Sequence, residues 1–274
     1  MRQLINSDKG IGLRPEHLQA LSQHPVNETI DFLELAPENW MSVGGLKQEL
    51  LEQFAEKYPL VAHGLSLSIG DAEPLNVEFV KQVRDFLNHF NISIYSEHLS
   101  LSKDSRGYLY DLIPTPRHKE NISYIADRIK YVQDIIQRPL VLENISYYHT
   151  YDNEMPEVEF LSLIVEQSQC EVLLDINNLF VNSQNHGYDP VAFIKAIPGN
   201  AIRYFHIAGH LECDDHFLLD THGKAVNDQV IDLAREVIKT HGERPVLLER
   251  DHHVPPLASL CDELNTIHHL MTHV

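Results

Sequence analysis

The amino-acid sequence predicts a closed (β/α)8 barrel of parallel strands, formed by residues 1–274 as a single domain. Its 274 residues match the usual length of one such barrel. Short apolar runs alternate with amphipathic stretches along the chain, which is the pattern of a parallel sheet covered by helices. No glycine-rich phosphate-binding motif follows the first apolar run, so a nucleotide-binding open sheet lacks its usual marker and no nucleotide cofactor is expected.

Eight runs have the composition of buried strands. Each is short, mostly apolar on successive residues and rich in Ile, Val, Leu and Phe, as expected for a strand covered on both faces. The predicted strands are 10–13, 31–35, 60–63, 92–98, 140–143, 172–175, 203–206 and 246–249. Between them, apolar residues recur at helical spacing, which predicts helices over 46–57, 78–90, 119–137, 158–168, 227–241 and 257–271. Asn76 and Asn227 stand where helix N-caps are expected.

The chain is strongly acidic, with 21 Lys and Arg against 40 Asp and Glu and a net charge of −19. Such a surface repels phosphate backbones, so no nucleic-acid partner is expected. Three scattered cysteines, Cys170, Cys213 and Cys261, argue against a disulfide framework. The first eight residues lack the apolar stretch of a signal peptide, and no apolar run reaches the length of a membrane span. We therefore expect a cytoplasmic protein without a membrane partner.

Six of the predicted strands end on a histidine or a carboxylate. In a parallel barrel these ends meet at one rim, where barrel enzymes place their active sites. So many acids in one cavity require protonation or neutralising cations, and mixed imidazole and carboxylate groups without thiolate suit iron, manganese or zinc. The residues at these ends are His63, Glu97 and His98, Glu143 and Asn144, Asp175 with Asn177 and Asn178, His206, and Glu249.

The segment after the seventh predicted strand is also rich in metal-ligating residue types. Asp220 and His222 are two residues apart, so both side chains can face one side of an extended segment. This pair would complete a second or third metal site beside the rim. The other ligand types in the segment are His210, Asp214, Asp215 and His216.

Eight short motifs together resemble a known family, and they follow one another in order over nearly the whole chain. They are GLRPEH (12–17), FLELAPENW (32–40), HGLSLS (63–68), SEHL (96–99), LENIS (142–146), LLDINN (173–178), HIAGH (206–210) and DTH (220–222). The sequence thereby resembles the multinuclear non-haem iron-dependent oxidative enzymes. That family was long known only as a domain of unknown function, and it includes the iron subunit of methanobactin biosynthesis. The resemblance implies a xylose-isomerase-like TIM barrel.

The resemblance also implies a set of site residues. Glu143 would bridge two irons, because a carboxylate can donate one oxygen to each. The implied iron ligands are His63, His98, Glu143, Asp175, Asn178, His206, Asp220, His222 and Glu249. The implied catalytic residues are Glu143, His98 and His210, and the candidates for contacts to the ligands or to the substrate are Glu34, Glu38 and Asn144.

What the resemblance implies for chemistry is an O2-dependent modification of cysteine residues in a ribosomally synthesised peptide. The cofactor would be two or three irons per chain in a mixed-valent Fe(II)/Fe(III) state, with zinc or manganese as a misloaded or alternative metal. The implied partners are a cysteine-containing precursor peptide and a small protein that binds its leader.

Three other functions stay open on the sequence. A divalent-metal-dependent sugar isomerase or epimerase would share the barrel and its rim but need no oxygen. A metal-dependent phosphodiesterase of the same superfamily is disfavoured by the net charge and by Asn178. This asparagine stands where the endonuclease pattern has a histidine, which is a better zinc ligand than an amide oxygen. A non-catalytic metal-binding protein would not need so many dissimilar ligands.

Overall fold

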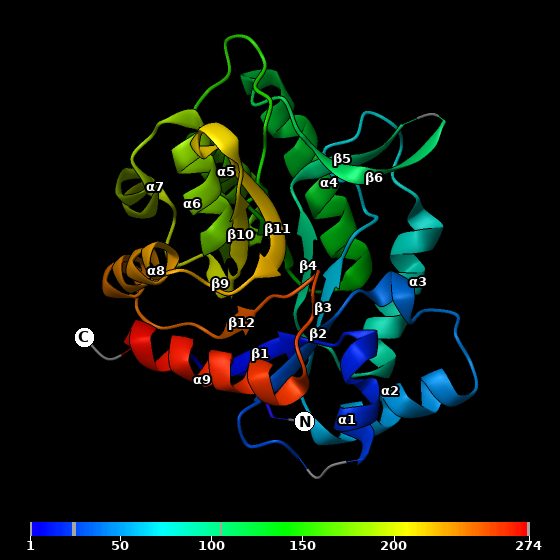
Figure 1. Cartoon of the computed structure of the whole chain (residues 1–274). Helices are drawn as coiled ribbons and strands as arrows, with labels where there is room; N and C mark the ends of the chain where they lie inside the picture. The colour runs from blue at the N-terminus through cyan, green and yellow to red at the C-terminus, as the bar shows by residue number, and fades with distance from the viewer. Residues whose placement is uncertain (1, 24–25, 105, 273–274) are drawn as a thin grey trace.

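Eight parallel strands close into a barrel in the computed structural model, which describes residues 2–23, 26–104 and 106–272. Around the barrel the strands follow the order β1, β12, β9, β8, β7, β4, β3 and β2, and β2 pairs with β1 to close the ring. The predicted fold class is confirmed, and Figure 1 shows helices surrounding the strands. The barrel strands are β1 (Lys9–Gly12), β2 (Phe32–Leu35), β3 (Leu60–Gly64), β4 (Tyr95–His98), β7 (Leu140–Glu143), β8 (Glu171–Asp175), β9 (Ile202–Ile207) and β12 (Val246–Leu248).

All six predicted helices are present, and their ends differ from the prediction by at most one residue. They are α2 (Leu46–Lys57), α3 (Val77–His89), α4 (Lys119–Ile136), α5 (Glu157–Ser168), α8 (Asp228–His241) and α9 (Leu257–Thr272). The predicted caps are also confirmed. The Asn76 side chain accepts a hydrogen bond from the backbone of Phe79, and the Asn227 side chain accepts one from Val230, which satisfies donors that each first turn leaves free.

Among the described residues, three further α-helices were not predicted: α1 (Leu18–Gln23), α6 (Ile176–His186) and α7 (Pro190–Ala196). α6 begins directly after β8, with Asp175 as its N-cap, and its first eight residues are all buried. These buried positions include Asn177, Asn178 and Asn182 beside apolar residues. Polarity therefore does not follow burial along this helix, and its sequence shows no clear amphipathic period. α1 and α7 are too short to show that period clearly.

The predicted strand 92–98 was too long at its start. The fourth barrel strand is assigned only from Tyr95, although the carbonyl of Ile94 already accepts a hydrogen bond from the backbone of Ala62 on β3. The end of the predicted strand 246–249 differs by one residue, because Glu249 lies just beyond β12. Its backbone nevertheless donates to the carbonyl of Ile207 on β9, which holds this residue at the rim.

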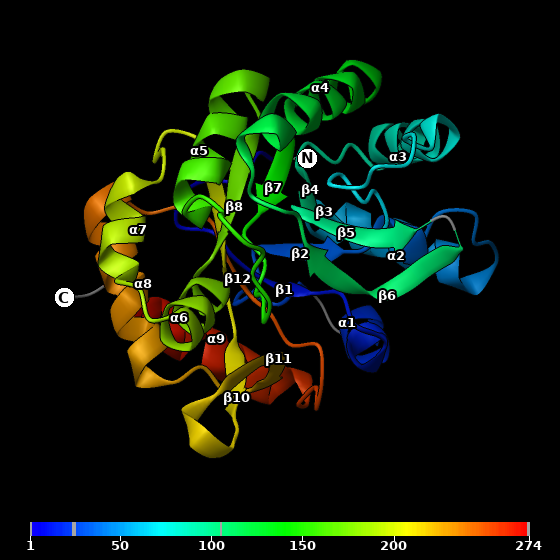
Figure 2. The ribbon, with the colours of Figure 1, turned by 90° about the horizontal axis from the view of Figure 1, so that it is seen from above.

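Two antiparallel hairpins extend from the barrel between a strand and the following helix. One joins β5 (Ser100–Asp104) to β6 (Gly107–Pro114), and the other joins β10 (Gly209–Glu212) to β11 (Leu218–Lys224). Figure 2 shows them reaching outward on different sides of the barrel. The sequence indicates an extended segment at 220–222 but predicts neither hairpin, since the residues of both hairpins are too mixed in polarity to show a strand pattern.

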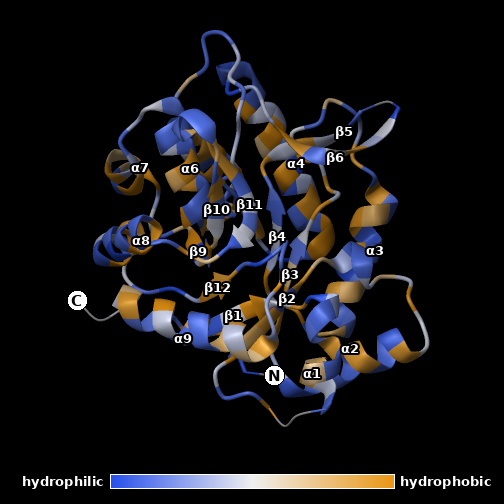
Figure 3. Ribbon diagram, in the orientation of Figure 1, coloured by the Kyte–Doolittle hydropathy of each residue, from blue (hydrophilic) through white to orange (hydrophobic). Residues whose placement is uncertain are grey.

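One layer of apolar side chains fills the interior of the barrel. It takes one residue from each of seven barrel strands or from the residue just before a strand: Phe32, Val61, Ile94, Val141, Leu173, Tyr204 and Leu247. On the eighth strand, β1, the corresponding residue is Gly10, and the ring of Phe32 occupies the space where its side chain would lie. A Cβ atom on Gly10 would lie 2.6 Å from that ring, so only glycine fits. A second, larger cluster packs the strands against the helices, whose inner faces are apolar in Figure 3.

All three cysteines are free, with Cys170 and Cys261 buried and Cys213 partly exposed. Within residues 2–23, 26–104 and 106–272, no helix has both the length and the apolar composition that a membrane span requires.

The interior layer should contribute strongly to stability. Leu173→Ala removes a fully buried side chain from the middle of this layer, and it should lower the free energy of unfolding by about 2–5 kcal/mol. Leu46→Ala, at an exposed position of α2, is the control and should change it by less than about 0.5 kcal/mol. Urea unfolding followed by circular dichroism tests both, and equal effects would contradict this account of the core.

Candidate metal centre

A polar layer lies directly above the apolar layer, two residues further along each strand. Side chains alternate between the two faces of a strand, so residue i+2 points into the barrel as residue i does. Val61 is followed in this way by His63, and Val141 by Glu143. The layer consists of Glu34, His63, Ser96, Glu143, Asp175, His206 and Glu249, all buried. The strands therefore bring together histidines and acids that are far apart in the sequence.

Three donor atoms meet at the ends of β3, β4 and β7. The Nε2 atoms of His63 and His98 lie 3.2 Å apart. Glu143 Oε2 lies 3.1 Å from the first of these nitrogens and 3.2 Å from the second. Two ligands each about 2.1 Å from one ion lie about 3 Å apart when they subtend roughly a right angle. The spacing of these three atoms therefore fits a single bound metal ion.

A second group of donors shares Glu143 with the first. Atoms of Glu143, Asp175, His206 and Glu249 all lie within 4.8 Å of one another. His206 Nδ1 is 3.0 Å from Glu249 Oε2 and 4.0 Å from both Glu143 Oε1 and Asp175 Oδ2. Glu143 thus turns one carboxylate oxygen toward each group, which is the arrangement that a bridging carboxylate requires.

Strand β11 brings a third set of donors to the rim. His222 Nε2 lies 2.6 Å from Asp220 Oδ1, while its Nδ1 lies 3.2 Å from Glu249 Oε2 and 3.3 Å from Asp251 Oδ2. His222 has a left-handed backbone conformation, with φ of 47°. This conformation is costly for a residue with a side chain, and such residues concentrate at functional sites. Asp220 and His222 face one another, as their spacing predicts.

Several buried atoms of these groups lie close together without forming hydrogen bonds. They are Glu143 Oε2, Asp175 Oδ2, Asn178 Oδ1, His206 Nδ1, His222 Nε2 and Glu249 Oε2. Leaving a buried polar atom without a hydrogen bond costs roughly 1–3 kcal/mol. Cations placed among these atoms would satisfy them together, because lone pairs that cannot hydrogen-bond to each other can all point at an ion. The residues present therefore fit a multinuclear metal centre.

Burial and neighbouring charges move the pKa values of the histidines in opposite directions. Burial lowers the pKa of His98 to about 4. Burial is also the largest single influence on His63 and acts in the same direction. The charge of Glu143, the hydrogen bond to it and the charge of Glu34 together outweigh burial and raise the pKa of His63 to about 9. The pKa of His206 is raised well above its usual range, because Glu34 and other carboxylates outweigh the effect of burial. Without a cation, protons on His63 and His206 balance the acids, and a metal ion would replace them.

The other predicted contact residues surround these donors. Asn144 holds the backbone of Asp175 with both ends of its amide: its Oδ1 accepts from Asp175 N at 2.8 Å, and its Nδ2 donates to Asp175 O at 3.0 Å. Asn178 Nδ2 lies 3.3 Å from Glu143 Oε1. Glu38 is further out, where it accepts hydrogen bonds from the backbone of the loop after β3, at Leu65 and Ser66.

His210 lies outside the cluster of donor atoms. Its Nδ1 is 2.8 Å from Asn177 Oδ1, its Nε2 is 3.3 Å from Asn227 Nδ2, and burial lowers its pKa. Both ring nitrogens are therefore occupied, and His210 reaches the site only through Asn177, which donates to Asp220 at 2.8 Å. The remaining ligand types of this segment, Asp214, Asp215 and His216, are exposed at the tip of the β10–β11 hairpin, in a 3-10 turn (Asp214–His216).

Four residues at the site were missed by sequence reasoning. Ser96 and Tyr204 could have been found from the two-residue step along β4 and β9. Asp251 lies two residues beyond Glu249 and is held beside His222, because its backbone N–H donates to the His222 carbonyl at 2.9 Å. Arg14 pairs with Asp251, and nothing in the sequence indicates that contact, which joins opposite ends of the chain.

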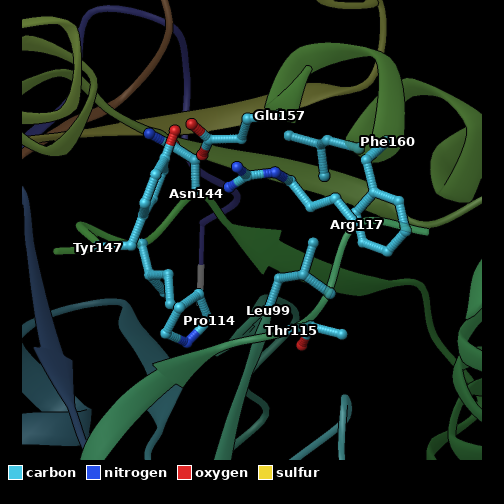
Figure 4. Close-up of a pocket in the computed structure, with 10 residues that line it drawn as sticks. Leu99, Pro114, Thr115, Arg117, Asn144, Tyr147, Glu157 and Phe160 are labelled. Atoms are coloured by element: carbon cyan, nitrogen blue, oxygen red, sulfur yellow. The ribbon is translucent and has the colours of Figure 1, made fainter. Parts of the chain in front are cut away.

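A small pocket lies behind the loop that follows β7, next to Asn144. Figure 4 shows the Arg117 guanidinium extended toward Glu157 and Tyr147 at this pocket. Arg117 is 2.7 Å from Glu154 and its guanidinium carbon lies 4.5 Å from the centre of the Tyr147 ring. This pocket contains a satisfied arginine and no group of metal ligands, so it supports the loop beside Glu143 and is not part of the metal centre.

A comparison with protein families gives one assignment for this chain. Residues 8–272 match the model of a family described as RiPP precursor modification enzyme MbnB/TglH/ChrH, where RiPP denotes a ribosomally synthesised and post-translationally modified peptide. The chain belongs to this family. The expected resemblance is thereby confirmed, and the match spans every strand of the barrel.

Several curated proteins are similar to this chain over most of their length. A UPF0276 protein of Shewanella loihica is 48% identical over 263 residues, covering 96% of this chain and 94% of the relative. A UPF0276 protein of Acinetobacter baylyi is 48% identical over 261 residues, with 94% and 89% covered. One from Pseudomonas aeruginosa is 41% identical over 270 residues, with 98% and 94% covered.

Solved structures that resemble this family member share its barrel. A xylose isomerase-like TIM barrel/4-hydroxyphenylpyruvate dioxygenase fusion protein superposes with a TM-score of 0.66 at 14% identity, over 96% of this chain and 43% of the fusion. Endonuclease IV from Thermus thermophilus gives 0.60 at 14% identity, over 97% and 100%. An L-ribulose 3-epimerase gives 0.60 at 12% identity, over 96% and 91%. The predicted xylose-isomerase-like barrel is thus confirmed.

Metal affinity should rise with pH. A metal ion must displace the protons that the raised pKa values keep on His63 and His206, so affinity should increase by about tenfold per pH unit for each proton displaced. For His63 this dependence should persist up to about pH 9. Chelator-competition titrations of Zn(II) between about pH 6 and about pH 8 measure the slope. His63→Gln should flatten it, and an affinity that falls with pH would contradict this assignment of protons.

Removing the shared carboxylate should affect two groups of donors at once. Glu143→Ala should lose most of the bound metal and leave the barrel folded, because an alanine fits the interior but offers no ligand. The matched control is Glu171→Ala, at the start of β8 and so at the opposite end of the barrel. Elemental analysis and circular dichroism test both variants. Full metal content in Glu143→Ala would exclude a bridging role for Glu143.

Proposed function

We propose that this protein is a multinuclear iron, O2-dependent oxidase that modifies cysteine residues of a ribosomally synthesised precursor peptide. Membership of a RiPP precursor modification family supports the peptide substrate. The observation that carries the proposal is the donor set: buried imidazole and carboxylate groups, without thiolate, grouped around two shared carboxylates, Glu143 and Glu249. Nitrogen and oxygen donors of this kind suit iron that must change oxidation state and keep open positions.

The first two proposed metal positions take their ligands from the ends of different barrel strands, and the third takes two of its ligands from β11. His63, His98 and Glu143 would hold one ion. Glu143, Asp175, His206 and Glu249 would hold the second. A third position would use Asp220 and His222 with Glu249 and Asp251. Asn178, whose amide lies against Glu143, would offer its Oδ1 as a neutral donor near the second ion. Bound iron would supply the activation of O2 and the one-electron steps that oxidation of a cysteine side chain requires.

The protein supplies the environment for that chemistry. The apolar layer beneath the site, with Leu173 and Leu247 fully buried, closes the barrel on one side and excludes water from below. None of the three cysteines belongs to the cluster of donors: Cys170 precedes β8, Cys213 lies near the hairpin tip and Cys261 is in α9. A thiolate at the centre would therefore come from the substrate.

A small leader-binding protein would deliver the peptide, as the family resemblance implies. A free-thiol substrate and three free cysteines suit the reducing cytoplasm. The net charge of −19 and the amide of Asn178 in place of an imidazole disfavour hydrolysis of nucleic acid.

The proposal is tested by combining metal analysis with product analysis. The protein is expressed with ample iron, purified without air and analysed for metals, and about two or three irons per chain are expected. It is then incubated with the cysteine-containing precursor peptide encoded beside its gene, with its leader-binding partner, with or without O2. Mass spectrometry should show a mass change on a cysteine only when O2 is present.

Glu143→Ala is the negative control for that reaction, and Glu171→Ala should retain it. Zinc or manganese with almost no iron, persisting after anaerobic reconstitution, would overturn the oxidase and favour an isomerase. An iron-loaded protein that modifies its peptide equally without O2 would overturn the O2-dependent reaction.

A further inference from the structure

A continuous chain of buried hydrogen bonds joins two histidines of the metal centre beneath the donor atoms. His63 Nδ1 lies 2.8 Å from Ser96 Oγ, and Ser96 Oγ lies 2.7 Å from the hydroxyl of Tyr204. Tyr204 donates to Glu34 Oε2 at 2.8 Å, and His206 Nε2 lies 3.1 Å from both Glu34 oxygens. All five residues are buried, so bulk water cannot replace any link.

The direction of every hydrogen bond in this chain follows from Glu34. As a carboxylate it can only accept, so Tyr204 gives its single hydroxyl proton to Glu34. The Tyr204 oxygen must then accept from Ser96, because two oxygens 2.7 Å apart need a proton between them. The competing acceptor of Ser96, the carbonyl of Ala62, is further away at 3.3 Å. Ser96 has then used its only proton and must accept from His63.

The same reasoning places a proton on His206. Its Nε2 faces only the oxygens of Glu34, so this nitrogen carries the hydrogen. The two remaining ring nitrogens, His63 Nε2 and His206 Nδ1, are the atoms that face Glu143. His63 Nδ1 and His206 Nε2 each carry a proton whether the imidazole ring is neutral or doubly protonated.

We propose that Glu34, Tyr204 and Ser96 are positioning residues that set the ring tautomers of His63 and His206, so that one carboxylate orients ligands of two metal positions. A histidine ligand depends on the partner of its other ring nitrogen for tautomer and orientation, and losing that partner typically weakens metal binding by about 10–100-fold. The unusual feature is that Glu34 contacts His206 directly and reaches His63 through the hydroxyl groups of Tyr204 and Ser96. The inference rests on the proposed metal centre but not on the reaction.

Single substitutions should affect the His63 end and the His206 end of this hydrogen-bond chain differently. Tyr204→Phe removes the nearer acceptor of the Ser96 proton. That proton can then turn either to the more distant Ala62 carbonyl or to His63 Nδ1, so the wild-type tautomer of His63 is no longer enforced. His206 keeps its contact with Glu34 and should be unaffected. Glu34→Gln disturbs both histidines, because an amide can donate to His206 Nε2. Ser96→Ala should match Tyr204→Phe at His63 and is a smaller change, which covers the case in which Tyr204→Phe fails to fold.

The experiment reads the tautomers directly. Protein labelled with 15N-histidine is loaded with Zn(II) alone, and long-range 1H–15N spectra identify which ring nitrogen carries the proton, with signals assigned by replacing single histidines. In the wild type we expect protonated Nδ1 in His63 and protonated Nε2 in His206. In Tyr204→Phe, Zn(II) titrations should show about 10–100-fold weaker binding at one position only. In Glu34→Gln both positions should weaken.

Tyr58→Phe is the matched control. Tyr58 is also buried, and its hydroxyl accepts from Asn27 on the far side of the core, so its loss should change neither tautomer. A proton on His63 Nε2 in the wild type would overturn the proposal, as would Tyr204→Phe and Ser96→Ala variants with unchanged tautomers and Zn(II) binding. A protein with the expected tautomers that never oxidises a peptide would disprove only the oxidase.

Discussion

The two-residue period of the barrel strands is the constraint on which the site depends. Each strand points alternate side chains into the barrel, so one apolar position is followed two residues later by a position on the same face. In this chain the lower of these positions form a closed apolar layer, and the upper ones carry histidine, serine or a carboxylate. Shifting one of these seven strands by one residue would exchange its buried polar side chain for one that faces outward. The register of the barrel and the geometry of the site are therefore inseparable.

The concentration of acids at the rim has an energetic consequence. Glu34, Glu143, Asp175 and Glu249 are all buried within one layer, and uncompensated charges in such a place are strongly unfavourable. The raised pKa values of His63 and His206 show how the protein balances the charge with protons. Protons and metal ions compete for the same ring nitrogens and carboxylate oxygens. Metal ions that replaced the protons would therefore balance the charge of the same buried carboxylates.

The support of the site extends into the apolar layer. Tyr204 belongs to that layer through its ring, while its hydroxyl reaches the polar layer. It is an aromatic residue with a polar end, which is how a buried tyrosine usually satisfies its hydroxyl. The clamp of Asn144 on the backbone of Asp175 adds a second rigid support. Most of the candidate ligands are thus held at the ends of the barrel strands, while Asp220 and His222 come from the β10–β11 hairpin. Placement on regular elements favours a preorganised centre.

The sequence by itself determined the fold class, the six amphipathic helices and the list of candidate ligands at the strand ends, because periodicity and residue type are local properties of a chain. It did not reveal α6, where buried asparagines obscure the helical period of apolar residues, or the two hairpins. Only the tertiary structure decided which oxygens and nitrogens meet, since distances such as that from His206 to Glu249 depend on strand register and barrel closure. Asp251, Arg14 and the Glu34–Tyr204–Ser96 chain likewise arise from contacts between strands and loops distant in sequence, which no local pattern encodes.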